Sequence, residues 1–222
     1  MSSSDLVELL FFFDSRLAFT RRLITIHAMD IPRDIRKQLC EQLLDYIART
    51  PERTDVAERV LKFVCSTPDC FDRSHESGHI TGSAWLINRN GDKTLLTLHR
   101  KLKLWVQPGG HADGDGDVLR VAMREAQEES GIADPIPLST RIYDIDIHTI
   151  PARPQCGEPE HLHYDIRYLL QAPHEQYVIS DESDALGWFS MEELLHLTPP
   201  ADAAVLRLAA LWPQAKQEFM NM

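Results

Sequence analysis

Residues 109–132 read GGHADGDGDVLRVAMREAQEESGI, a loop of glycines and aspartates that runs into an amphipathic stretch. Apolar residues in the second half fall on one side at helical spacing, which predicts a helix from about Asp117 to Ser130. Gly131 follows, in the position where a helix commonly ends with a left-handed residue. This part of the chain is therefore expected to form a loop, a helix and a sharp turn.

Three glutamates of this helix carry the first chemical argument. Glu125, Glu128 and Glu129 are neighbours at spacings of three and four residues, so their carboxylates crowd onto one side. Like charges at that spacing destabilise a helix by roughly a few tenths of a kcal/mol per pair. Hard divalent cations such as Mg²⁺ or Mn²⁺ prefer oxygen ligands and would offset the repulsion. A solvated acidic face is the other interpretation of the same pattern.

The residues around the glutamates resemble the signature of the Nudix hydrolase family. That signature runs Gly, five residues, Glu, seven residues, and then Arg-Glu-apolar-x-Glu-Glu-x-Gly-apolar. The positions that match it are Gly110, Arg124, Glu125, Glu128, Glu129, Gly131 and Ile132. A gapped match of this length is specific, and the strand-like segments around it extend the resemblance from about residue 78 to 197.

One position departs from the family pattern. The first signature glutamate falls at position 116, which is glycine here, between Asp115 and Asp117. Either aspartate is placed to supply the missing carboxylate, and Asp117 is alternatively the N-cap of the helix. The GGHADGDGD stretch, with His111 after the glycine pair, resembles a subgroup distinct from the nucleotide-sanitising type.

The resemblance implies a metal-dependent hydrolase that cleaves a phosphoanhydride bond in a nucleoside diphosphate linked to another group. Its cofactor would be Mg²⁺ or Mn²⁺, and its substrate a small nucleotide-type molecule. Glu125, Glu128 and Glu129 would be the metal ligands. Glu128 or Glu129 would act as general base, and Arg124 would orient a glutamate through a charge-assisted hydrogen bond. Glu182, before Trp188, is either a further carboxylate of the site or a surface acid.

Two other functions remain open on the same fold. A non-catalytic nucleotide- or ligand-binding regulator is compatible with Gly116 and the additional helices. A diphosphate isomerase would require a catalytic cysteine or glutamate pair that the sequence does not identify. Turnover of a substrate panel with Mg²⁺ or Mn²⁺ distinguishes these functions.

A second set of polar residues alternates with apolar ones in two later segments. The set consists of Asp144, Asp146 and His148 in the first segment, and His161, His163, Asp165 and Arg167 in the second. A period of two places each group on one face of a strand, and the connection at 150–160 allows the two strands to pair antiparallel. The polar faces would then line up.

This second set has two interpretations. His148, His161 and His163 would form a substrate wall that contacts phosphate, or a second metal site. Alternatively, they are the wet side of a half-buried sheet. His111 and Arg100 are further candidates for contact with substrate, although Arg100 also fits the solvated face of a hairpin.

The whole pattern predicts an α/β (α+β) fold, a Nudix-like mixed sheet sandwiched by helices. Strands are expected near 80–87, 94–98, 104–106, 139–149, 162–171 and 186–189, and a closing helix at 201–211. Apolar spacing before the first glycine predicts helices from about 5 to 66. We therefore divide the chain into a helical N-terminal extension, 1–70, and a hydrolase domain, 71–222.

Composition limits the partners. A net charge of −11 argues against general nucleic-acid binding, and the four cysteines lack the spacing of a zinc ribbon. The apolar run at 9–13 is too short to cross a bilayer and follows acidic residues. A cytoplasmic protein without a membrane segment is expected, and the same run suggests a homodimer.

Overall fold

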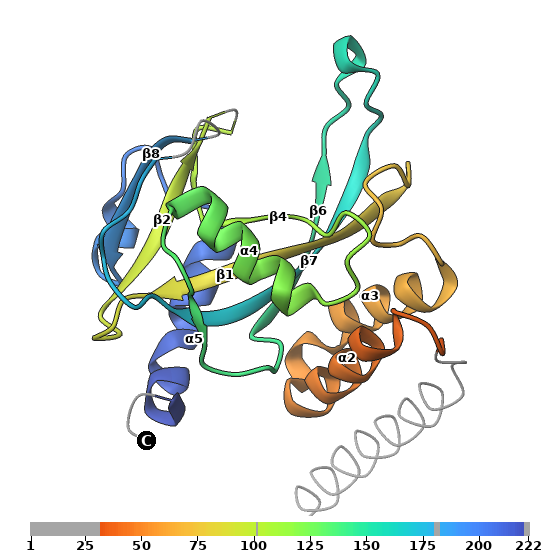
Figure 1. Ribbon diagram of the computed structural model, residues 1–222, viewed down its shortest axis with the longest axis horizontal. Coiled ribbons are helices and arrows are strands. Elements are labelled where there is room, and N and C mark those ends of the chain that lie inside the picture. Colours follow the sequence, from red (N-terminus) through yellow and green to blue (C-terminus); the bar gives the residue numbers. More distant parts are fainter. Residues whose placement is uncertain (1–31, 101, 180–182, 220–222) are drawn as a thin grey trace, which may run out of the picture.

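The computed structural model describes residues 32–100, 102–179 and 183–219 (Figure 1). The apolar run at 9–13, with the homodimer inferred from it, lies outside these residues, and so does Glu182. Within the described parts of the chain, no helix is long and apolar enough to cross a membrane.

Two helices separated by a short 3₁₀ turn form the described part of the N-terminal extension. They are α2 (Lys37–Arg49), η1 (Pro51–Arg53) and α3 (Thr54–Ser66). On α2 the apolar residues Leu39, Leu43 and Ile47 recur at spacings of four and are buried. Pro51 cannot donate a backbone hydrogen bond, so helix α2 ends before it.

A mixed sheet forms the centre of the molecule. Its strands are β1 (Gly78–Ile87), β2 (Lys93–His99), β3 (Trp105–Val106), β4 (Gly109–His111), β5 (Ile136–Pro137), β6 (Asp144–Ile150), β7 (His161–Gln171) and β8 (Ser183–Ser190). Strand β1 pairs antiparallel with β2 and β4 and parallel with β7, while β6 pairs antiparallel with β7. The α/β fold with a mixed sheet is confirmed.

Two boundaries differ most from the sequence prediction. The strand expected from 139 begins only at Asp144, because the chain before it forms the short strand β5 and a bend. The closing helix is longer than 201–211 and spans Ala203–Phe219 as α5, with Pro213 inside it. A short helix, η3 (Glu193–His196), lies before α5.

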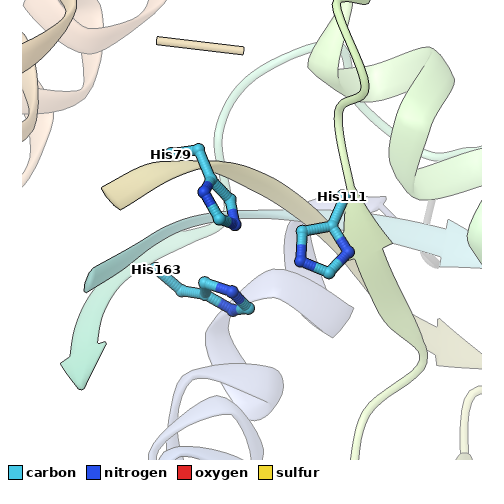
Figure 2. Close-up of side chains that lie close together, drawn as sticks. All are labelled: His79, His111 and His163. Carbon is cyan, nitrogen blue, oxygen red and sulfur yellow. The ribbon is translucent and has the colours of Figure 1, made fainter. Parts of the chain in front are cut away.

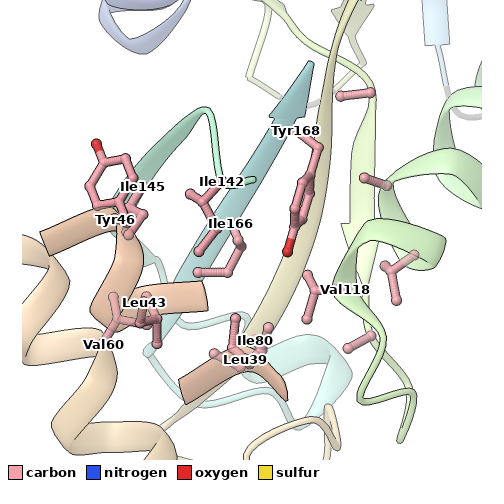
Figure 3. Close-up of a cluster of buried hydrophobic side chains, with 14 of the residues drawn as sticks. Leu39, Leu43, Tyr46, Val60, Ile80, Val118, Ile142, Ile145, Ile166 and Tyr168 are labelled. Atoms are coloured by element: carbon pink, nitrogen blue, oxygen red, sulfur yellow. The ribbon is translucent and has the colours of Figure 1, made fainter. Parts of the chain in front are cut away.

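Helices cover both faces of the sheet (Figure 1). Helix α4 (Val118–Ser130) packs with α2 and α3 on one face, where one buried cluster includes Leu43, Val60, Ile80, Val118 and Tyr168 (Figure 3). Helix α5 packs on the other face in a separate buried cluster that includes Trp85 and Trp212. The N-terminal helices therefore share a hydrophobic core with the sheet.

Candidate functional site

Helix α4 begins and ends as its sequence predicts. The side chain of Asp117 accepts a hydrogen bond from the backbone N–H of Arg120 at 3.2 Å, so Asp117 is the N-cap. Gly131 adopts the left-handed conformation with φ of 67° and ends the helix. The glutamates consequently lie on the last two turns of α4.

Strand β4 holds two of these glutamates at very short range. A β-carbon at Gly110 would lie 2.4 Å from Oε2 of Glu125, so only glycine permits this approach. The backbone N–H of Gly109 donates to Oε1 of Glu129 at 2.9 Å. The glycine pair of the signature thus positions the carboxylates against the sheet.

Arg124 links the same helix to the strand. Its Nη2 donates to Oε1 of Glu125 at 2.8 Å and to the backbone carbonyl of His111 at 2.7 Å. Glu128 is exposed, while Glu125 and Glu129 are half-buried. The three carboxylates offer hard oxygen atoms from one side of a fixed helix, a donor set that fits Mg²⁺ or Mn²⁺.

The missing signature glutamate at Gly116 has a steric explanation. A β-carbon at this position would lie 2.7 Å from the backbone oxygen of Ile35, so the chain before α2 occupies the space of a side chain. Asp115 is not a free substitute for the missing glutamate carboxylate, because its Oδ1 accepts a hydrogen bond from Nη2 of Arg120 at 2.6 Å. Asp117 is used as the N-cap.

The second polar set lies on the face of the sheet opposite α4. The antiparallel pairing of β6 and β7, predicted from the alternating pattern, aligns Asp144 with Arg167 and His148 with His163. Along the strands the polar residues form two groups. The aspartates and an arginine lie toward α5, and the histidines lie toward the other end of the strands. These groups differ in how their polar atoms are paired.

The first group, the arginine–aspartate network, consists of Arg167, Asp144, Asp146 and Asp165. Arg167 is 2% exposed, and its three nitrogens donate to the three carboxylates at 2.7 Å (Asp165), 2.9 Å (Asp144) and 3.1 Å (Asp146). Burial opposes the charge of Arg167, but the adjacent carboxylates outweigh it and raise the pKa of the guanidinium. The network is a structural ion cluster.

Neighbouring elements complete this network. The hydroxyl groups of Thr81 and Ser83 on β1 donate to Oδ1 of Asp165 at 3.1 and 2.7 Å. From α5, Nη2 of Arg207 donates to Asp144 at 2.9 Å. Parallel pairing of β1 with β7 places these hydroxyls next to the carboxylate.

The second group, the histidine cluster, consists of His79, His111, His148, His161 and His163. The ring centroid of His163 lies 4.9 Å from His79, 5.0 Å from His111, 5.2 Å from His161 and 5.4 Å from His148. Figure 2 shows the rings of His79, His111 and His163 converging. The structure therefore brings together the four histidines that were candidates from the sequence. It adds a fifth, His79, that the sequence analysis missed.

His79 escaped the sequence analysis because the first strand was expected to begin at Ile80. The strand begins at Gly78, which places His79, Thr81 and Ser83 on one face in the same period of two as the later strands. This alternation of residues on one face was the sequence signal that could have identified His79. The pairing of His79 with His163 in parallel register was not readable from either segment alone.

Burial keeps the core of the histidine cluster neutral. It lowers the pKa of His79 from the ordinary 6.5 to about 4, with the charges of His111 and His161 adding to the effect and the His75 backbone opposing it. Burial and the neighbouring histidines lower the pKa of His163 to about 2. The pKa of His111 is also lowered, chiefly by burial. These rings offer lone pairs at neutral pH.

Arg100 lies away from this cluster, at the end of β2. Its Nε donates to Oδ1 of Asp184 at 3.3 Å and its Nη2 to the backbone carbonyl of Ser183 at 3.2 Å. Lys103 also contacts Asp184. The contacts of Arg100 are those of an exposed hairpin, and a role in binding substrate remains a prediction.

Comparison with known proteins agrees with this architecture. The family model described as NUDIX domain matches residues 79–209, more than half of the chain, so the chain belongs to that family. The match contains the carboxylates of α4 and all members of both polar groups on the sheet.

Two curated relatives illustrate the range of the family. Human m7GpppN-mRNA hydrolase NUDT17 is 30% identical over 132 residues, which cover 54% of this chain and 38% of that protein. The probable DHNTP pyrophosphohydrolase of Lactococcus lactis subsp. cremoris is 28% identical over 90 residues, covering 40% and 53%. The alignments thus span about half of these relatives or less.

Among solved structures, the MutT protein of Methanosarcina mazei Go1 has a TM-score of 0.47 at 19% identity, covering 64% of this chain and 97% of that chain. The E. coli dihydroneopterin triphosphate pyrophosphohydrolase has a TM-score of 0.45 at 18% identity, covering 64% and 96%.

Proposed function

We propose that the chain is a metal-dependent pyrophosphohydrolase that cleaves a phosphoanhydride bond in a nucleoside diphosphate linked to another group. The observation that carries the proposal is the fixed set of carboxylates on α4, with Glu125 against Gly110 and Glu129 bonded to the N–H of Gly109. Family membership supports it.

In this proposal, Glu125, Glu128 and Glu129 hold Mg²⁺ or Mn²⁺, which when bound supplies positive charge to the phosphate oxygens. Arg124 fixes the orientation of Glu125 through the hydrogen bond between them. Glu128 or Glu129 accepts the proton of the attacking water. Glu129 also accepts a hydrogen bond from the N–H of Gly109. Of the variants Glu128→Gln and Glu129→Gln, the one with the larger loss of kcat identifies the general base.

The names of the relatives support the substrate class. One is an m7GpppN-mRNA hydrolase and the other a probable DHNTP pyrophosphohydrolase, which is compatible with a nucleotide-type molecule that carries a phosphate chain. The candidates that contact it are Arg100, His111, His148, His161 and His163. The net charge of −11 argues against general nucleic-acid binding.

The same proposal includes the organisation of the chain. Residues 1–70 form a helical extension, 71–222 the hydrolase domain, and the GGHADGDGD stretch defines the subgroup. A homodimer through the apolar run at 9–13 and a cytoplasmic location complete it. Light scattering of the full chain and of a version lacking that run tests the homodimer.

The test of the activity is a substrate panel with each metal, followed by glutamate substitutions. We expect Mg²⁺- or Mn²⁺-dependent turnover of at least one nucleotide sugar, capped dinucleotide, dinucleoside polyphosphate or pterin triphosphate. Glu128→Gln and Glu129→Gln should each lower kcat by at least about 100-fold, as for loss of a general base. Glu41→Gln, an exposed glutamate on α2, is the matched control and should retain full activity.

A regulator on the same fold is the alternative, favoured by Gly116. It predicts that ligands of the panel bind, as measured by calorimetry, while no phosphate or monophosphate is released with either metal. Wild-type rates in both Glu128→Gln and Glu129→Gln would contradict the assignment of the site to α4.

A further inference from the structure

Three histidines from three different strands meet on the face of the sheet opposite α4. His79 lies on β1, His111 at the end of β4 and His163 on β7. Because β1 pairs with both other strands, His79 stands directly beside His163 in register, and its neighbour Thr81 stands beside His111. The sheet itself therefore fixes the three side chains with respect to one another (Figure 2).

Three ring nitrogens of His79 and His163 are buried without hydrogen-bond partners within the described part of the chain. His79 is 2% exposed, and neither its Nδ1 nor its Nε2 makes a hydrogen bond within the described part of the chain. The Nε2 of His163 is buried and unpaired in the same way. A buried polar atom without a hydrogen bond costs about 1–3 kcal/mol, so their convergence indicates a ligand.

The geometry fits a metal ion. One ring nitrogen from each of His79, His111 and His163 lies within 4.8 Å of the other two. In a tetrahedral zinc site with Zn–N bonds of about 2.0–2.1 Å, ligand nitrogens stand roughly 3.4 Å apart. Binding would require the side chains to rotate so that the three nitrogens come closer together.

We propose that His79, His111 and His163 bind a transition metal ion of the zinc type, at a site separate from the carboxylates of α4. Three neutral imidazoles select a borderline-soft ion such as Zn²⁺ rather than Mg²⁺, which requires oxygen ligands. The fourth position is open to water or to a phosphate oxygen. The depressed pKa values of His79 and His163 keep their lone pairs available and disfavour an anion as the occupant.

A nearby histidine supports the site without belonging to the three. His161 is 6% exposed, and its ring lies 5.0 Å from that of His79. Its Nδ1 lies 2.9 Å from the carbonyl oxygen of Pro159, which accepts a hydrogen bond from that nitrogen and orients the ring. His161 therefore lies beside the three ligands without being one of them.

An ion at this position would tie β4 to the sheet beside the proposed catalytic helix. His111 contributes its ring to the three and its backbone carbonyl to Arg124, which donates to Glu125. The metal would thus restrain the strand that positions the carboxylates. This role does not depend on the identity of the substrate.

Metal content of the tag-free full chain tests the proposal. After treatment with a chelator, reloading with Zn²⁺ and desalting, we expect one tightly held zinc per chain in the Glu128→Gln/Glu129→Gln double variant. That background weakens binding by α4, so the retained zinc reports the histidine site alone. Reloading with Co²⁺ should give the visible absorption of a four-coordinate site, and Zn²⁺ should raise Tm.

Histidine variants in the same background decide the location. His79→Asn and His163→Gln should lose the zinc and the Co²⁺ spectrum. His174→Gln, an exposed histidine elsewhere, should keep both. If His79→Asn does not fold, as judged by circular dichroism, His111→Gln replaces it because that side chain is only half-buried. Absence of bound metal in the parent, or equal zinc and Co²⁺ absorption in folded histidine variants, would overturn the proposal.

Discussion

The arginine–aspartate network and the histidine cluster occupy the same face of β1, β6 and β7, yet they are built differently. In the network, Arg167 donates to three carboxylates, and the hydroxyls of Thr81 and Ser83 donate to Asp165. In the cluster, both ring nitrogens of His79 lack hydrogen bonds within the described part of the chain.

This difference separates a structural cluster from a ligand site. Buried charges persist in folded proteins when opposite charges and hydrogen bonds compensate them, which is the condition of Arg167. Buried polar atoms without such compensation destabilise the fold unless a ligand supplies the missing partner. Burial by itself therefore does not identify a ligand site; the additional observation here is that several unpaired ring nitrogens converge.

The largest effect is expected from breaking the network. Arg167→Met leaves three adjacent carboxylates without their central cation and should lower the free energy of unfolding by about 3–5 kcal/mol, measured by urea denaturation. Arg141→Met, at a side chain that is 58% exposed, is the control and should change it by less than about 0.5 kcal/mol. A loss of under about 1 kcal/mol for Arg167→Met would mean that the pairing is not structural.

Lowering the pH should distinguish the histidine cluster from the arginine–aspartate network, because His79 and Asp146 titrate in different pH ranges. The folded-state pKa of His79 is about 4 against an ordinary 6.5, so the unfolded chain binds the proton first. In the metal-free protein the contribution of His79 to stability is fully present above pH 6.5 and decreases as pH falls toward 4, by on the order of 2 kcal/mol at pH 5. His79→Asn should remove that part of the slope in denaturation curves.

Asp146 of the network should respond at lower pH. Burial opposes ionisation of Asp146, but the charges of Arg167 and Arg207 outweigh it and lower its pKa below the ordinary 3.8. Its contribution to stability is present above pH 3.8 and is lost as pH falls through the lower folded-state pKa. Equal slopes for wild type and His79→Asn between pH 6.5 and 4 would contradict the separation of the two ranges.

The smallest effect is expected from a single donor to the network. Ser83→Ala removes the 2.7 Å hydrogen bond to Asp165, while Thr81 and Arg167 still donate to that carboxylate. The free energy of unfolding should fall by about 1–2 kcal/mol, since the acceptor is charged and buried. Ser66→Ala, at an exposed serine of α3, is the control; an equal loss there would show that burial of the acceptor is irrelevant.

Features that depend on nearby residues were predictable from the sequence. Helical spacing placed Glu125, Glu128 and Glu129 on one side of α4, and the cap residues Asp117 and Gly131 act as expected. The period of two in β6 and β7 predicted their antiparallel pairing, because a hairpin joins strands that are close in the chain.

Features that depend on distant segments were not. Parallel pairing of β1 with β7 brings His79 to His163 across more than eighty positions, and β4 then adds His111. The contact between Gly116 and Ile35 likewise joins the signature loop to the N-terminal segment. Neither segment carries a local pattern that specifies its partner.

The sequence by itself determined the family, the carboxylate helix and the alternation of polar residues along each strand, because these follow from spacing within one element. Only the tertiary structure decided which polar atoms are paired. Register between strands sets the distances among side chains. Those distances leave Arg167 bonded to three carboxylates, and the ring nitrogens of His79 without hydrogen bonds within the described residues.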